Sequence, residues 1–234
     1  MQGIGAGRPR RRRGSRQAAA GWRRWAWGLW LALLPLAAGA LPVGTFINEI
    51  YYNNVGPDIG EGIEVAGPAG LSLAGWQLVL YDGATGAPYY TRGLGGTIDD
   101  EGDGTGALSF PFYYPWGIQN GDPDGVALVD ATGGVRQFLS YGGSFVALSG
   151  PARDLRSLDI GRVQPDDSPL DTSLQLVGSG HDYADFVWQG PAPASLGRLN
   201  DGQTLTPVPL PKSLWLLASG LVALILLRWG HHRS

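Results

Sequence analysis

Short apolar runs separated by glycine, proline and aspartate fill the middle of the chain. Residues 76–81, Trp-Gln-Leu-Val-Leu-Tyr, are apolar at almost every position and are followed by the turn pair Asp82-Gly83. A run that is apolar on both faces predicts a central strand, covered on each side. Residues 125–130 and 135–141 flank a glycine-containing turn and predict a β-hairpin.

The pattern predicts about nine short strands and no long helix, because no extended window keeps a helical period without glycine or proline. The remaining predicted strands cover residues 43–52, 63–66, 107–112, 157–163, 173–177 and 184–188. Short strands between regularly spaced turn signals are typical of an all-β sandwich or barrel. The expected core residues are Trp76, Trp188, Phe138, Leu78, Leu80, Leu128, Leu139, Leu174 and Leu176.

The N-terminal residues 1–40 carry the features of an export signal. An arginine-rich segment, 8–24, precedes the apolar segment 25–40, which ends in small residues at Ala38 and Ala40. These three parts predict a secretory signal peptide cleaved after Ala40. The alternatives are a nucleic-acid-binding arm, which the adjoining apolar run disfavours, and a twin-arginine signal, which lacks its usual polar residues here.

The C-terminal residues 207–234 carry a second targeting pattern. A proline-rich linker leads into an apolar run, 213–227, and then a basic tail. The run is shorter than the roughly 20 residues of a comfortable membrane span. Lys212 can snorkel, and Trp215 and Trp229 can lie at the interfaces, so we expect a short transmembrane helix with a cytoplasmic tail. A buried terminal helix is the alternative, which the absence of a polar stripe disfavours.

The linker, the short helix and the basic tail resemble a PEP-CTERM sorting signal, a tag of exported proteins in Gram-negative bacteria. The motif position is filled by Val208, Pro209, Leu210 and Pro211, with leucine where that family most often has glutamate. The resemblance implies recognition by a membrane sorting protease, an exosortase, and removal of the helix. The protein would then be anchored only transiently in the inner membrane before reaching the cell surface or the medium.

A series of short sequence words runs through the segment between these ends, residues 41–206. The words lie at 47–50 (INEI), 60–65 (GEGIEV), 73–76 (LAGW), 80–83 (LYDG), 119–128, 137–142, 173–176 (SLQL), 186–188 (FVW) and 197–203 (GxxNxGQ). The series resembles that of bacterial lamin-tail domains. This resemblance implies an immunoglobulin-like β-sandwich in a secreted or surface protein. It implies a binding or structural role and transfers no catalytic residue.

The formal net charge of −3 is the sum of three segments with different charges. Residues 1–40 carry +8, residues 41–206 carry −14, and residues 207–234 carry +3. The middle segment has six arginines against 20 acids, so it lacks the positive charge that neutralises phosphates, and we expect no nucleic acid partner. The chain has no cysteine, which excludes disulfides, thiolate metal sites and cysteine nucleophiles.

Two acid-rich turns are candidate calcium sites. Oxygen-bearing side chains alternate at Asp99, Glu101 and Asp103 before one glycine, and at Asn120, Asp122 and Asp124 before another. Calcium-binding loops of the EF-hand type begin in this way. Neither segment has the glutamate that such a loop needs at its twelfth position. The alternative is two hydrophilic turns whose side chains bond the local backbone.

Patterns that would indicate catalysis are weak. Glu61 and Glu64 are three residues apart and would face opposite sides of a strand, so they do not form the carboxylate pair of a glycosidase. A pairing of either with Glu49 stays open, although a structural hydrogen-bonding role at a sheet rim is the favoured interpretation. His181 is the only histidine in the middle segment, and no nucleophile elbow accompanies it.

Aromatic residues cluster at 51–52, 89–90 and 112–116, where they would either cap the core or stack on sugars. The sequence thus predicts a non-enzymatic exported module that binds extracellular polysaccharide, matrix or a protein partner. The alternative is a metal-dependent extracellular hydrolase of nucleic acid or glycan that uses the acid-rich turns. Convergence of Glu49, Glu61 or Glu64 with His181 in one cleft would favour the hydrolase.

Overall fold

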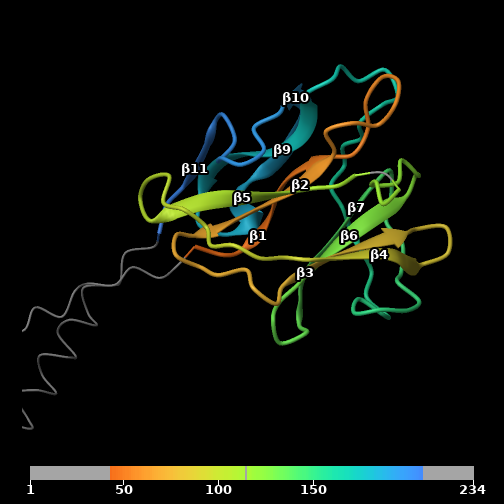
Figure 1. The fold of residues 1–234 in the computed structure, drawn as a ribbon, viewed down its shortest axis with the longest axis horizontal. Coiled ribbons are helices and arrows are strands. Elements are labelled where there is room, and N and C mark those ends of the chain that lie inside the picture. The colour runs from red at the N-terminus through yellow and green to blue at the C-terminus, as the bar shows by residue number, and fades with distance from the viewer. Residues whose placement is uncertain (1–42, 114, 208–234) are drawn as a thin grey trace, which may run out of the picture. The chain divides into compact units, whose positions relative to one another are not determined.

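The computed structural model describes residues 43–113 and 115–207, which form two β-sheets (Figure 1). One sheet has the strand order β10-β9-β1-β2-β5, with β11 added beside β9, and the other has the order β4-β3-β6-β7-β8. The strands are β1 (Phe46–Tyr51), β2 (Gly62–Pro68), β3 (Gln77–Asp82), β4 (Ala87–Gly93), β5 (Thr105–Pro111), β6 (Asp124–Val129), β7 (Val135–Tyr141), β8 (Leu158–Asp159), β9 (Thr172–Gly180), β10 (Val187–Pro193) and β11 (Gln203–Leu205). Within the described residues the only helical element is a three-residue 3-10 turn, Tyr183–Asp185.

The predicted all-β class is confirmed, and each predicted strand overlaps an observed one. The expected hairpin is present, because β6 and β7 pair antiparallel and join through a turn closed by Asp130 and Gly134. Two strands were not predicted. Strand β4 contains Pro88 and lies at a sheet edge, where proline is tolerated, and β11 has only three residues.

The main core lies between the two sheets. It combines residues of the first sheet, such as Ile50 and Ile63, with residues of the second, such as Leu80 and Leu139. Eight of the nine expected core residues are buried, and Trp76 is half-buried against the same cluster. Two sheets packed on a shared apolar core form a sandwich-like arrangement rather than a closed barrel.

A smaller apolar cluster covers the outer face of the second sheet. Val79 and Tyr81 of β3 pack there against Phe138 of β7 and against Phe145 and Ala152 from the segment that follows β7. Strand β3 is therefore buried on both faces, and it also has a neighbouring strand on each side. The prediction that residues 76–81 form a central strand is confirmed.

Both predicted targeting segments lie outside the described residues. This applies to the signal peptide with Ala38 and Ala40, and to the sorting motif from Val208 to Pro211 with its apolar run. Among the residues that the structure describes, no helix has the length and apolar character needed to cross a membrane.

Replacement of Leu128 should reveal the contribution of the main core. Leu128 is fully buried on β6, so Leu128→Ala should lower the free energy of unfolding by about 2–5 kcal/mol in a urea titration. The control is Leu158→Ala on β8, where the side chain is 55% exposed and the expected change is within about 0.5 kcal/mol. Equal losses in the two variants would contradict the assignment of the core.

Candidate functional site

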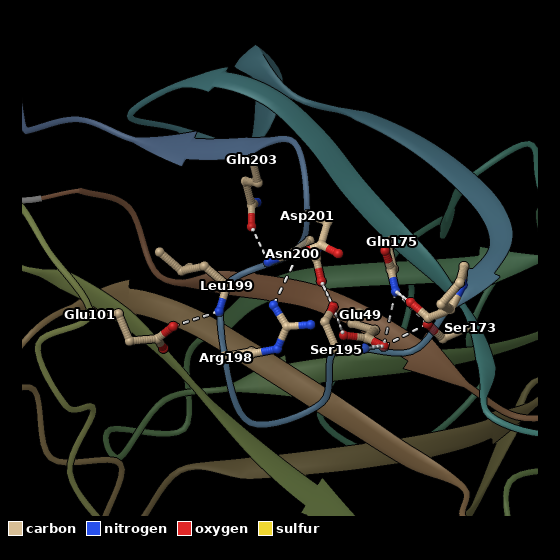
Figure 2. Close-up of polar contacts among 11 residues, drawn as sticks. Glu49, Glu101, Ser173, Gln175, Ser195, Arg198, Leu199, Asn200, Asp201 and Gln203 are labelled. Carbon is tan, nitrogen blue, oxygen red and sulfur yellow. Dashed lines mark hydrogen bonds and ion pairs between the residues drawn. The ribbon is translucent and has the colours of Figure 1, made fainter.

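Glu49 is fully buried on β1 and holds the segment that follows β10 (Figure 2). Its Oε1 accepts hydrogen bonds from the Ser173 hydroxyl on β9 and, at 2.9 Å, from the backbone N–H of Ser195. Its Oε2 lies 2.8 Å from the Ser195 hydroxyl. A buried carboxylate needs such donors, because an uncompensated charge in the interior is costly.

Glu64 lies directly opposite Glu49 on the paired strand β2 and is also fully buried. Its Oε1 accepts a hydrogen bond from the Asn48 amide at 2.9 Å, and its Oε2 accepts one from the backbone N–H of Gly197 at 2.6 Å. Burial raises the pKa of Glu64 to about 8, and the nearby charge of Glu49 adds to this increase. Both carboxylates are therefore used to bind backbone and side chains of the chain itself.

The same segment is held by three further side chains. The Asn200 amide donates to the carbonyl oxygens of Asn48 and Leu176, at 3.1 and 2.9 Å. The Gln203 amide donates to the Asn48 side chain at 2.6 Å. From the edge strand side, Glu101 Oε2 accepts a hydrogen bond from the Leu199 N–H at 2.8 Å (Figure 2). We call residues 194–205, which these contacts fasten across the first sheet, the C-terminal strap.

The predicted hydrogen-bonding role of Glu49 and Glu64 is confirmed, but their predicted place at a sheet rim is wrong. Strands β1 and β2 are interior strands of the first sheet. Polar residues on a strand normally face water, which favours a position at a sheet rim. Here the C-terminal strap covers Glu49 and Glu64 instead. The available signal was the presence of Asn200 and Gln203, whose amides could match buried acids near the N-terminus of the domain.

Glu61 shares no hydrogen-bond partner with these two acids and contacts the loop after β5 at its start and at its middle. Its carbonyl oxygen accepts from the Phe112 N–H at 2.9 Å, and its Oε2 accepts from the Ile118 N–H at 3.1 Å. Its Oε1 is buried and has no hydrogen-bond partner among the described residues. Burial raises the pKa of Glu61 to about 7, which its N–H partner at Ile118 partly offsets.

His181 lies in the turn between β9 and β10, next to two aspartates. Its Nε2 is 3.2 Å from Asp182 Oδ2 and its Nδ1 is 3.3 Å from Asp185 Oδ2. None of the hydrogen-bond partners of Glu49, Glu61 or Glu64 in the described part of the chain is His181. The convergence that would favour a hydrolase is therefore not present in these contacts.

In the first acid-rich turn, Asp99 and Asp103 are exposed, while neighbouring acids bond the backbone. Asp100 Oδ1 accepts from the N–H groups of Gly102 and Gly104, at 2.9 and 3.2 Å. Glu101 Oε1 accepts from the Ala107 N–H, so both of its oxygens bind backbone groups. These contacts are those of a hydrophilic turn, one of the two interpretations drawn from the sequence.

In the second acid-rich turn, Asp124 is buried, and its two oxygens accept from the N–H groups of Gly83 and Gly121, both at 2.9 Å. Asn120 and Asp122 border an open cleft of about 510 Å³. Among residues 43–113 and 115–207, no three histidine, cysteine or acid side chains form a group suited to hold a metal ion. Calcium binding at either turn stays a prediction, which a titration with calcium would test.

The aromatic clusters divide between core and surface. Tyr52 is buried and stacks on Tyr141 with ring centroids 3.9 Å apart, so it caps the core. In contrast, Tyr113 is 69% exposed and Trp116 is 56% exposed on the loop after β5. The Trp116 ring lies parallel to the ring of Tyr90, with centroids 5.6 Å apart and an interplanar angle of 8°.

Tyr90 belongs to β4 and also meets the buried ring of Phe112 edge-on at 6.1 Å. Strands β4 and β5 are edge strands of different sheets, so these rings lie where one open side of the sandwich is closed. The Tyr90 ring contacts those of Phe112 and Trp116, and we call these three residues, together with the exposed Tyr113 of the same loop, the aromatic platform. Its inner rings pack against the protein, and its outer rings are available to a ligand.

Comparison with known proteins gave no match: no family model, no curated protein and no solved structure is similar enough to this chain to inform its function. The site is therefore judged on its own chemistry. The buried glutamates serve the fold, whereas Trp116 of the aromatic platform is an exposed ring that stacks on Tyr90.

The folded chain should be less stable at about pH 8 than at about pH 5. Burial raises the pKa of Glu61 to about 7 and that of Glu64 to about 8, from 4.5. The folded chain therefore keeps these protons where the unfolded chain has released them. This stability is fully present below pH 4.5 and is lost as the pH rises through the two raised values. Urea denaturation at both pH values measures the loss.

Glu64→Gln should reduce this loss, because the variant has no carboxyl proton to release at that position. The charge-matched control is Asp167→Asn, in an exposed residue outside the C-terminal strap, and it should behave as the unaltered chain does. If Glu64→Gln loses as much stability between the two pH values as the unaltered chain, the role assigned to Glu64 is wrong.

Proposed function

We propose that this chain is a non-catalytic β-sandwich module of an exported protein, and that its aromatic platform binds extracellular polysaccharide. The observation that carries the proposal is the exposed Trp116 ring, supported from behind by Tyr90. Tryptophan and tyrosine provide large, rigid and amphipathic contact surfaces at low cost in conformational entropy. A ring held flat in this way suits the C–H-rich face of a sugar.

Charge and area favour a polysaccharide over the other partners considered. The domain carries −14, which disfavours nucleic acid. A stable protein interface buries about 800 Å² on each partner. The platform offers two exposed aromatic side chains beside the acid-rich loop that follows them, which is a small contact area. Polysaccharides can use small sites, because repeated sugar units can occupy several sites on neighbouring molecules.

The proposal assigns no catalytic residue. The carboxylates of Glu49 and Glu64 are enclosed, and each of their oxygens has a donor within the protein. His181 pairs with neighbouring aspartates. These contacts support a structural role for the acids. A metal-dependent hydrolase is the competing proposal, and it predicts shortening of the polymer rather than binding alone.

The proposed fold family is the immunoglobulin-like sandwich of bacterial lamin-tail domains. The two-sheet arrangement supports this assignment at the level of architecture. The sequence words behind the resemblance supply the residues of one network: Asn48 and Glu49 from the first, Glu64 from the second, and Asn200 and Gln203 from the last. Their joint role in fastening the C-terminal strap supports treating the words as one set.

The proposed route is export by the signal peptide, transient anchoring in the inner membrane, and processing by an exosortase. The signals at 1–40 and 207–234 support this route through their sequence patterns. Delivery to the cell surface or the medium would place the aromatic platform among extracellular polymers. Calcium remains part of the proposal only as a possible ligand of the acid-rich turns.

Trp116→Ala should weaken polysaccharide binding by about tenfold, which corresponds to about 1.4 kcal/mol, because one stacking ring is lost. Affinity electrophoresis of the full chain in mild detergent, with neutral and acidic soluble polysaccharides in the gel, measures the change. The control is Leu148→Ala, which removes an apolar side chain that is 65% exposed outside the platform. Unchanged binding in Trp116→Ala would contradict the proposal, and a shortened polymer would favour the hydrolase.

A further inference from the structure

We propose that the aromatic platform prefers acidic polysaccharides, and that Arg92 is the residue that binds the carboxylate of a uronic acid unit. This inference rests on the proposed function, because it concerns the same surface. It names the class of ligand as a polymer whose sugar units carry carboxylates. The aromatic rings alone would not distinguish a charged polysaccharide from a neutral one.

Arg92 lies against the platform, next to the Phe112 ring. It is two residues beyond Tyr90 on β4, and side chains at this spacing face the same side of a strand. Its guanidinium carbon is 5.4 Å from the centroid of the Phe112 ring, the ring that also meets Tyr90. A continuous row of contacts therefore runs from Arg92 through Phe112 and Tyr90 to the exposed ring of Trp116. A sugar chain along this row would meet both a flat ring and a positive charge.

The charge of Arg92 has no counterion among the described residues. Arg136, Arg153 and Arg198 each pair with an aspartate, at 2.6, 3.5 and 3.0 Å. The side chain of Arg92, in contrast, has neither an ion pair nor a hydrogen bond in the described part of the chain, and its Nε is buried without a partner. Because Nε is enclosed, a carboxylate from solution would bind the two terminal amino groups of the guanidinium, which can donate two parallel N–H bonds to it.

The negative charge of the domain disfavours any polyanion at long range, so the preference for an acidic polysaccharide depends on a local contact with Arg92. Charges farther than about 8 Å are largely screened at physiological ionic strength, so contacts at the platform decide the outcome. Glu61 contacts the platform loop at Phe112 and Ile118, and Asp58 contacts the same loop at Asn120. Burial raises the pKa of Glu61 to about 7, so near neutral pH this carboxyl carries only part of a full charge.

The experiment compares two polymers with the same sugar backbone: polygalacturonate, whose carboxylates are charged, and its fully methyl-esterified form, which is neutral. The full chain in mild detergent is tested by affinity electrophoresis against both. The unaltered chain should bind the acidic polymer about tenfold more tightly. Arg92→Gln should lose this preference while keeping its affinity for the ester, because the rings remain. Retained binding to the ester also shows that the platform is still folded.

Arg153→Gln is the matched control, because it removes the charge of an arginine whose side chain is 70% exposed and which lies outside the platform. It should keep the preference for the acidic polymer. Equal binding of both polymers by the unaltered chain, or an unchanged preference in Arg92→Gln, would overturn the role of Arg92 and leave the proposed function standing. Binding of neither polymer by the unaltered chain would overturn both proposals.

Discussion

Two carboxylates on adjacent interior strands, Glu49 and Glu64, set the main constraint on this structure. They are fully buried and lie opposite each other on β1 and β2. Two acids in this position must find hydrogen-bond donors. The sheet itself supplies the Ser173 hydroxyl on β9 and the Asn48 amide on β1. The C-terminal strap supplies the backbone N–H groups of Ser195 and Gly197. The first sheet is therefore complete only when the strap is in place.

The outer face of one sheet is covered by apolar contacts and that of the other by polar contacts. This difference determines which strands could be predicted from the sequence. The outer face of the second sheet is covered by apolar residues such as Phe145, so Val79 and Tyr81 of β3 are apolar too. An apolar run of this kind predicts a central strand. The first sheet is covered through polar contacts, so the sequence pattern predicts that Glu49 and Glu64 are exposed. A hydropathy pattern records polarity and does not record which polar groups find partners within the fold.

The exposure of the aromatic platform could not be predicted from the sequence pattern either. The cluster at 112–116 was visible in the sequence, but the division into buried and exposed rings was not. That division depends on where the edge strands β4 and β5 meet, and β4 was itself missed because Pro88 and its half-buried residues resemble a loop. Glu61 then fixes the loop at Phe112 and Ile118. The exposure of Trp116 thus follows from contacts between segments far apart in the chain.

The folded domain ends immediately before the proposed sorting signal, because the C-terminal strap is its last packed segment among the described residues. Its last strand, β11, pairs with β9, and Leu205 is buried. One residue beyond the strap, the Thr206 N–H donates a backbone hydrogen bond to the Gly180 carbonyl. The motif that begins at Val208 follows after one residue. Cleavage beyond this point would remove the proposed anchor without breaking any contact of Glu49 or Glu64. The buried acids thus hold the domain closed independently of the membrane, which a protein released after sorting requires.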